Sequence, residues 1–306
     1  MTPSASRPLQ LRCGGRVLDL SQPRVMAVIN VTPDSFSDGG RLYREGRVDL
    51  DTVLREVECA IDDGAALIDI GGESTRPGAV AVSDGEEADR VLPVVEAISR
   101  RFDTIISVDS SNARVMREAA ALGAGLLNDV RSFRRDGALQ AAADAGLPVC
   151  VMHMSDEPDR MQLSPQYSDI VTEVRNFLCD RIAACRAVGI ASDQIVIDPG
   201  FGFGKTLEHN LALFRALPNY VAMHYPVLVG VSRKTMIGDI TTRPVNERLA
   251  GSITLAAMAA QSGAHIIRAH DVRETVDALA VVGALAAEES NHGKRSSDSD
   301  SIEDRA

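Results

Sequence analysis

The stretch Ala66-Leu-Ile-Asp-Ile-Gly-Gly-Glu-Ser-Thr-Arg76 joins a short apolar run to a polar, glycine-rich segment. Such runs, with little alternation, are typical of strands buried on both faces of a parallel sheet. The arrangement occurs eight times along the chain, about every 34 residues, which is the size of one βα unit. The eight runs are Val25–Ile29, Ala66–Ile70, Thr104–Val108, Gly125–Leu127, Pro148–Met152, Gln194–Ile197, Pro226–Val231 and His265–Ala269.

Amphipathic helical patterns fill the gaps between the runs. The second of them starts with a possible capping box, Ser83 and Glu86, and Pro93 inside it indicates a kink or a later start. The others are Asp49–Asp63, Ala113–Leu122, Gly137–Ala145, Asp169–Val188, Leu207–Leu217, Asn246–Gln261 and Val272–Ala287. Eight strands alternating with eight helices predict an α/β fold, a single-domain (β/α)8 TIM barrel. An open doubly wound sheet is the alternative, but the glycine fingerprint of dinucleotide binding is missing.

The limits of the barrel are predicted from local composition. The 306 residues suit one barrel of this kind. We expect a flexible N-terminal segment at residues 1–14 and the barrel at residues 15–287. Residues 288–306 are rich in Ser and Asp and carry one large apolar residue, Ile302, so we expect a disordered polar tail.

The composition restricts the partners and the compartment. A net charge of −11 disfavours binding to nucleic acid and to anionic membrane surfaces. Polar residues interrupt the longest charge-free run, Leu249–Ile267, so we expect no membrane span. Five cysteines without a CxxC pair indicate reduced thiols, and the N-terminus lacks a signal-peptide core, so we expect a cytoplasmic protein.

Polar residues follow all eight apolar runs, and in a parallel barrel these positions meet at the end where barrel enzymes place their chemistry. Carboxylates and amides among them can pair with the donors and acceptors of a fused amino-oxo heterocycle. Clustered cations suit a diphosphate or a carboxylate, and Mg2+ could bridge phosphate oxygens with few protein ligands. The polar residues include Asn30, Arg76, Asp109, Asn128, Asp198, Lys234, Arg268 and His270.

Other interpretations of these residues remain open. Gly204-Lys-Thr206 has the ending of a P-loop, but Pro199 stands where the first glycine is required. Lys234 and Arg268 could instead pair with Asp198 and Asp271 for structural reasons. His153 ends the fifth run between two methionines, which favours packing over catalysis.

Five motifs resemble those of the dihydropteroate synthase family of pterin-binding barrels. They are Asn30-Val-Thr-Pro-Asp-Ser-Phe-Ser-Asp-Gly-Gly40, Asp69-Ile-Gly-Gly-Glu-Ser-Thr-Arg-Pro-Gly78, Asp198-Pro-Gly-Phe-Gly-Phe-Gly-Lys205, Gly230-Val-Ser-Arg-Lys234 and Arg268-Ala-His-Asp271. The resemblance spans about residues 17 to 285, and the first two motifs are long and distinctive. Small departures, such as Ser110 where Thr is common and Ala269 where Val is usual, remove no expected site residue.

The resemblance implies a transferase of folate biosynthesis that condenses (7,8-dihydropterin-6-yl)methyl diphosphate with p-aminobenzoate. Asn30 would help to hold Mg2+, the implied cofactor, and Arg268 and His270 would hold the diphosphate and act in catalysis with Asp109. The implied pterin pocket contains Asp109, Asn128, Met152, Asp198, Gly202, Phe203 and Lys234. Thr75, Arg76 and Ser232 would lie at the p-aminobenzoate end, shaped by Ser74 and Pro77, where sulfonamides would compete.

The assembly and the rival functions follow from the same residues. Leu249–Ala260 is apolar nearly all round its helix, so we expect a homodimer through the last two helices, in agreement with the resemblance. A pterin-dependent methyltransferase would share the barrel but not the first two motifs, Asn30–Gly40 and Asp69–Gly78, which we call the first and second loop signatures. A pterin-binding protein without catalysis is the remaining alternative, disfavoured by the intact Asn30, Thr75, Arg76, Arg268 and His270.

Overall fold

The computed structural model describes residues 9–32, 43–44, 47–74, 82–155 and 166–299. Eight parallel strands form one sheet in the order β10-β9-β8-β7-β6-β3-β12-β11. A parallel bridge between Ile197 and Val227 joins β10 to the residue before β11 and brings the two ends of the sheet together. The eight-stranded barrel is therefore confirmed, and the open sheet is excluded. Its strands are β3 (Arg24–Asn30), β6 (Leu67–Gly71), β7 (Ile105–Asp109), β8 (Leu126–Asp129), β9 (Val149–Met152), β10 (Ile195–Asp198), β11 (Leu228–Val229) and β12 (Ile266–Ala269).

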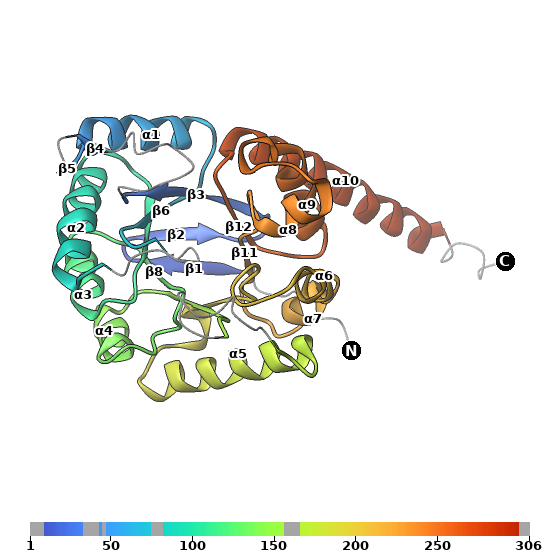
Figure 1. Ribbon diagram of the computed structural model, residues 1–306. Coiled ribbons are helices and arrows are strands. Elements are labelled where there is room, and N and C mark those ends of the chain that lie inside the picture. The colour runs from blue at the N-terminus through green and yellow to red at the C-terminus, as the bar shows by residue number, and fades with distance from the viewer. Residues whose placement is uncertain (1–8, 33–42, 45–46, 75–81, 156–165, 300–306) are drawn as a thin grey trace.

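Helices surround the strands as an outer layer (Figure 1). They bury apolar faces against the outer faces of the strands in one continuous core. The capping box of Ser83 and Glu86 is present at the start of α2, and that helix passes through Pro93 without ending. The helices are α1 (Leu50–Asp62), α2 (Asp84–Arg101), α3 (Ala113–Ala121), α4 (Ala138–Ala145), α5 (Ile170–Ala187), α6 (Leu207–Arg215), α7 (Leu217–Val221), α8 (Thr235–Thr241), α9 (Leu249–Gln261) and α10 (Val272–Ser299), with short 3-10 turns η1 (Ser192–Gln194) and η2 (Val245–Glu247).

An antiparallel hairpin of β1 (Gln10–Cys13) and β2 (Arg16–Asp19) lies against the amino-terminal end of the barrel. Leu11, Cys13 and Leu18 are almost fully buried in it. They pack on a floor of inner-face residues, namely Met26, Leu67, Ile105, Leu126, Cys150, Val196, Leu228 and Ile266. The expectation of a flexible segment over residues 1–14 is therefore wrong at residues 10–14, because the open end of a barrel exposes apolar side chains that need a cover.

One further boundary differs from that expected, and one short element was not predicted. The helix α10 continues to Ser299, past residue 287, so residues 288–299 are helical rather than disordered. A helix already nucleated by packed residues propagates at little cost per added turn, which polar composition alone does not reveal. A second short hairpin, β4 (Tyr43–Arg44) with β5 (Arg47–Val48), precedes α1.

Candidate active site

The inner faces of the strands carry two layers of opposite character. Leu126, Val196 and Ile266 belong to the apolar floor. Side chains alternate along a strand, so the residue two positions later faces the same interior. Those residues are Asn128, Asp198 and Arg268. In the same way Asp69 lies two positions after Leu67, and Asp109 lies four positions after Ile105, again on the same face. The polar residues at the carboxyl ends of the strands are thus gathered directly above the floor, as the sequence predicted.

A fully buried carboxylate, Asp69, lies at the centre of the upper layer. Its Oδ2 accepts a hydrogen bond of 2.6 Å from Nε of Arg268, whose Nη2 donates to Asp109 Oδ2 at 3.1 Å. The amide nitrogen of Asn128 lies 3.4 Å from both oxygens of Asp69. Three of the predicted site residues therefore meet through a fourth that we did not assign to the site. A charged residue inside an apolar strand was the signal, because an unpaired buried carboxylate is costly.

Burial and neighbouring charge shift the titration of this layer. Burial raises the pKa of Asp109 well above its ordinary value, the charge of Asp69 raises it further, and Arg268 lowers it. The same two carboxylates hold the pKa of Arg268 high. Arg268 is therefore the counter-charge of two acids, and the structure does not show the alternative in which it pairs with Asp271. Asp271 instead forms an ion pair with Arg233, from Nε to Oδ2 at 3.1 Å.

A second group surrounds Asp198, which is 7% exposed. Its Oδ1 accepts the backbone N–H of Gly200 at 2.7 Å, and burial raises its pKa to about 6 although Lys234 and Lys205 lower it. Burial also lowers the pKa of Lys234 to about 8. The Lys234 ammonium donates to the carbonyl of Phe201 at 2.8 Å and lies 3.9 Å from the ring centroid of Phe203.

The glycine-rich loop after β10 is held by close backbone contacts. Gly200 has a φ of +72°, and a Cβ there would lie 1.9 Å from the carbonyl oxygen of His153, so no other residue fits. The buried Lys205 ammonium donates to the carbonyls of Gly200 and Phe203, and lies 2.9 Å from Nδ1 of His153. His153 is thus a structural residue, as expected. Met152 packs with Phe203 beside Gly202 and its loop.

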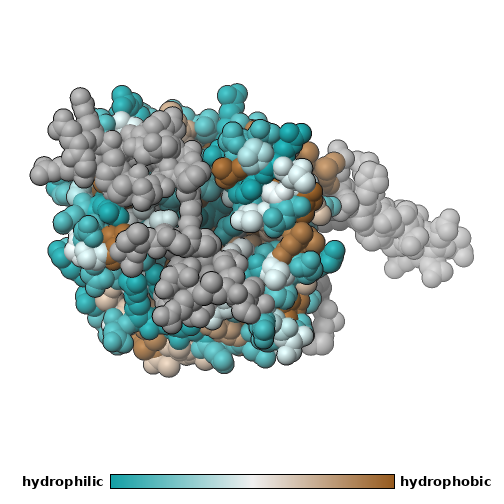
Figure 2. All heavy atoms as spheres, viewed as in Figure 1, coloured by the Kyte–Doolittle hydropathy of each residue, from teal (hydrophilic) through white to brown (hydrophobic). Residues whose placement is uncertain are grey.

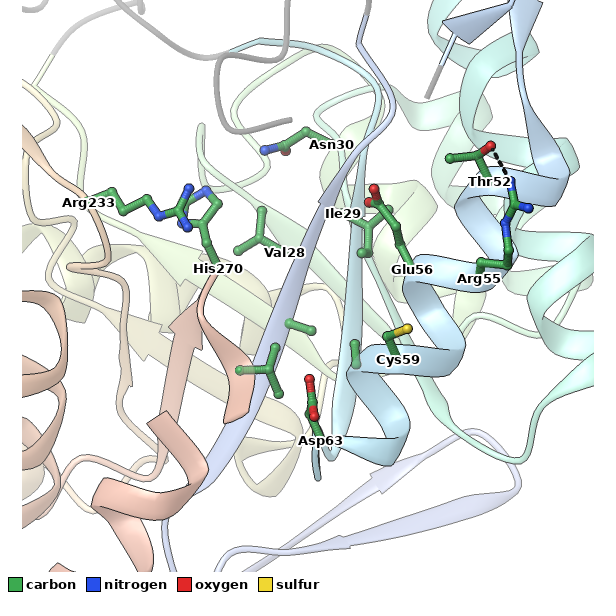
Figure 3. Close-up of a pocket in the computed structure, with 13 residues that line it drawn as sticks. Val28, Ile29, Asn30, Thr52, Arg55, Glu56, Cys59, Asp63, Arg233 and His270 are labelled. Carbon is green, nitrogen blue, oxygen red and sulfur yellow. Dashed lines mark hydrogen bonds between the residues drawn. The ribbon is translucent and has the colours of Figure 1, made fainter. Parts of the chain in front are cut away.

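A cavity of about 440 Å³ lies between β3 and α1. Asn30, His270 and Arg233 line one end of it, and residues of α1 and β3, together with Asp63 and Val272, line the rest (Figure 3). The backbone N–H of His270 donates to Oγ of Ser232 at 3.2 Å, and its Nδ1 lies 3.1 Å from the same oxygen. Ser232 therefore lies next to the expected diphosphate residues. Thr75 and Arg76 fall outside the described residues, as do residues 33–40 of the first loop signature and 75–78 of the second.

The chain is similar in sequence to a known enzyme family along most of its length. A model of the family described as "Pterin binding enzyme" matches residues 26–270. A dihydropteroate synthase of Escherichia coli (strain K12) is 50% identical over 92% of this chain and 99% of its own, and one of Haemophilus influenzae is 48% identical over 91% and 99%.

Solved structures agree with the sequence comparison. A Yersinia pestis dihydropteroate synthase in a sulfonamide drug complex superposes with a TM-score of 0.88 at 50% identity, covering 91% of this chain and 99% of that one. A Xanthomonas albilineans dihydropteroate synthase with 4-aminobenzoic acid gives a TM-score of 0.85 at 45% identity, with 92% and 99% covered. The chain therefore belongs to the pterin-binding enzyme family, and within it to the dihydropteroate synthases.

Proposed function

We propose that the polar layer binds the pterin ring of (7,8-dihydropterin-6-yl)methyl diphosphate, beside the cationic residues that receive its diphosphate. The chain is a transferase of the dihydropteroate synthase type, which joins this pterin to p-aminobenzoate and releases diphosphate. The observation that supports the placement is the buried network of Asp69, Arg268, Asp109 and Asn128 at the carboxyl ends of the strands. A fused amino-oxo ring can pair with such acids and amides, and analogues that leave them unpaired are rejected strongly.

The pterin pocket combines both groups of the site. Asp109, Asn128 and Asp198 supply acceptors and an amide, and Lys234 supplies a donor. Met152, Gly202 and Phe203 line the pocket: Met152 is almost fully buried, and the Cδ of Lys234 comes within 3.0 Å of the place where a Cβ on Gly202 would lie. A larger residue at position 202 would therefore displace the Lys234 side chain from the ring of Phe203.

The chemical step needs no protein nucleophile. The methylene carbon of the substrate is benzylic in character and can carry positive charge while its C–O bond to the diphosphate breaks, and the neutral arylamine then attacks. We assign Arg268 and His270 to the departing diphosphate. Asp109 would stabilise positive charge on the pterin, since a cationic ring favours its ionised form.

The residues near the diphosphate fit a metal that is carried mainly by the substrate. We assign Asn30 to Mg2+ because its amide oxygen is a hard donor at the end of β3, in the cavity that His270 also lines. Among the described residues no cluster of three acids, histidines or cysteines could hold an ion by itself. Mg2+ commonly keeps its waters and binds through phosphate oxygens, where it would neutralise the charge of the leaving group.

The acceptor end is assigned from the second loop signature. Thr75 and Arg76 would contact p-aminobenzoate, with Ser232 near by, and sulfonamides would compete for the same place. Two related solved structures support an acceptor and an inhibitor of this kind, since the Yersinia pestis enzyme is in complex with a sulfonamide drug and the Xanthomonas albilineans enzyme with 4-aminobenzoic acid.

We also propose a homodimer in the cytoplasm. Large apolar side chains are exposed on α9 and α10, including Leu249 at 40%, Met258 at 48% and Val281 at 62%. Figure 2 shows apolar side chains on the side of the molecule where Figure 1 places α8 to α10. The five cysteines are free, which suits a reducing compartment. Within the described residues, no helix has the length and the apolar character needed to span a bilayer.

The proposal is tested by measuring diphosphate release from the pterin diphosphate in the presence of Mg2+, with and without p-aminobenzoate. Release that requires p-aminobenzoate and yields 7,8-dihydropteroate is the expected result. Tight pterin binding without turnover would contradict it and would indicate a binding protein or a different acceptor.

A further inference from the structure

A buried polar cluster contains Glu73 of the second loop signature together with Arg131 and Ser111, and none of these residues has been assigned to either substrate. Glu73 and Arg131 form its central ion pair, with side chains 9% and 4% exposed. We propose that this pair positions the second loop for p-aminobenzoate, so that Glu73 and Arg131 are positioning residues for the acceptor. The inference rests on the proposed function and names residues that this function does not use.

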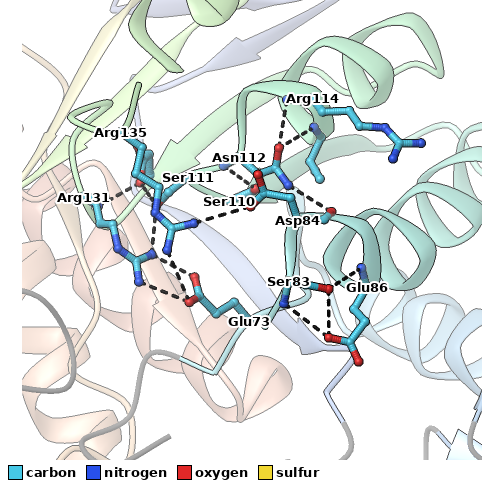
Figure 4. Close-up of polar contacts among 12 residues, drawn as sticks. Glu73, Ser83, Asp84, Glu86, Ser110, Ser111, Asn112, Arg114, Arg131 and Arg135 are labelled. Atoms are coloured by element: carbon cyan, nitrogen blue, oxygen red, sulfur yellow. Dashed lines mark hydrogen bonds and ion pairs between the residues drawn. The ribbon is translucent and has the colours of Figure 1, made fainter. Parts of the chain in front are cut away.

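The pair has the geometry of a rigid fork. Nη1 of Arg131 donates to one carboxylate oxygen of Glu73 at 2.8 Å, and Nη2 donates to the other at 3.1 Å (Figure 4). Nη1 also donates to the hydroxyl of Ser111 at 3.1 Å. A bidentate arrangement fixes both the distance and the orientation of the two side chains, which a single contact does not.

The cation of this pair is itself held by the barrel. Arg131 follows β8, and its backbone N–H donates to Asp129 Oδ1 at 2.8 Å. The same carboxylate accepts the N–H of Phe133 through its other oxygen, and Ser111 donates to it. Ser111 follows β7, whereas Glu73 follows β6. The ion pair therefore ties the residues after three adjacent strands into one unit.

The backbone before Glu73 is fixed as well. A Cβ at Gly72 would lie 2.5 Å from Cγ2 of Val91 on α2, so the chain passes against the helix where only glycine fits. Nη1 of Arg90 donates to the Gly72 carbonyl at 3.1 Å. The chain is held on both sides up to Glu73, and Thr75 follows two residues later. Glu73 is thus a fixed point, two residues before Thr75 in the sequence.

The ion pair occupies a place where charge is costly without a partner. Keeping one guanidinium and one carboxylate there requires good geometry and further hydrogen bonds, both of which are present. Apolar packing could give the same stability without the desolvation cost of two buried charges. A requirement for a fixed position of Glu73 would explain why the ion pair is present instead. An error of about 1 Å in substrate position can cost about a hundredfold in rate, so a displaced loop should weaken the acceptor step strongly.

The experiment compares Glu73→Gln and Arg131→Lys with the wild type, by steady-state kinetics of diphosphate release in both substrates. We expect the KM for p-aminobenzoate to rise at least about tenfold, while the KM for the pterin diphosphate changes less than about twofold. Lysine keeps the positive charge but cannot make the two parallel hydrogen bonds, so the KM for p-aminobenzoate should also be raised in Arg131→Lys. The double variant should be no worse than the worse single variant, because the two residues act as one unit.

Arg135→Gln is the matched control. Arg135 approaches the same carboxylate at only 3.8 Å and is 35% exposed, so its loss should leave both KM values nearly unchanged. Calorimetry with the pterin shows that each variant is folded, and Glu73→Asp, which keeps the charge and shortens the reach, replaces any variant that is not. An unchanged KM for p-aminobenzoate, or an equal rise for both substrates, in an active enzyme overturns this inference alone. An inactive wild type contradicts the proposed function instead.

Discussion

At the scale of single residues, the site depends on buried acids, and burial makes two of them reluctant to ionise. Asp69, Asp109 and Asp198 all lie in the upper layer of the barrel, and burial raises the pKa of the latter two. Each is held by a cation or by a backbone N–H, which is how a barrel can keep acceptors in place for a ligand.

Asp198→Asn tests this view. In the proposed pocket the ionised carboxylate would accept hydrogen bonds from pterin N–H groups. Wild-type pterin affinity should therefore fall about tenfold per pH unit below about pH 6, where burial places the pKa of Asp198. Asp198→Asn should bind pterin at least about tenfold more weakly at pH 8 and lose this pH dependence. Calorimetry between pH 5 and 8 measures both, with the exposed Asp193→Asn as the control. Unchanged affinity would remove Asp198 from the pocket.

The stability of the unliganded protein should respond to pH in the opposite direction. The folded pKa of Asp198, about 6, lies above its ordinary value of 3.8, so ionisation opposes folding. The contribution of this group is fully present below about pH 3.8 and is lost as the pH rises through about 6. Urea unfolding of the wild type and of Asp198→Asn should therefore differ in pH dependence within this window.

At the scale of elements, α2 packs against Gly72 of the second loop signature. Its N-terminus carries a complete capping box, in which Ser83 accepts the N–H of Glu86 at 3.3 Å and Glu86 accepts the N–H of Ser83 at 3.3 Å. Ser83→Ala should lower the free energy of unfolding by about 1 kcal/mol. Both KM values should hardly change, because Gly72 is also fixed against the body of the helix. A large rise in either KM would show that the cap acts on the site itself.

The hairpin of β1 and β2 closes the opposite end of the barrel. Leu11 is fully buried on the apolar floor, so Leu11→Ala should cost about 2–5 kcal/mol of unfolding free energy. The active site lies at the other end of the strands, so kcat and both KM values at low temperature should be preserved. Val17→Ala, at a hairpin position that is 58% exposed, is the control. Equal urea midpoints for Leu11→Ala and Val17→Ala would argue against the hairpin as a structural plug.

At the scale of the whole molecule, the exposed apolar side chains of α9 and α10 form the surface on which we propose that two chains associate. Light scattering at micromolar concentration should give twice the mass of one chain. The double variant Met258→Glu/Val281→Glu should give one chain, because charges in an apolar interface stay unpaired. Val17→Glu, at the hairpin, should remain dimeric. A monomeric wild type would refute the dimer.

The local sequence pattern was enough to predict the eight strands of the barrel, most of the helices between them and the end of the barrel where the candidate site lies. Buried parallel strands are apolar on both faces and the βα unit has a regular length, so both leave a local pattern along the chain. The candidates Asp109, Asn128, Asp198, Lys234 and Arg268 were found because polar residues after such strands are conspicuous. The short helix α8, which follows Lys234 directly, left no such pattern.

Which charged residues form ion pairs with one another could be seen only in the folded structure. Asp69 was hidden inside a strand, and its contact with Arg268 joins residues 199 positions apart. The ion pair between Glu73 and Arg131 was not predicted, and residues 1–14 were expected to be flexible although residues 10–13 form the first strand of a hairpin. Periodicity reports the face on which a residue lies, whereas partners across the barrel depend on how the sheet closes. That closure is a property of all eight strands together, and no single stretch of sequence carries it.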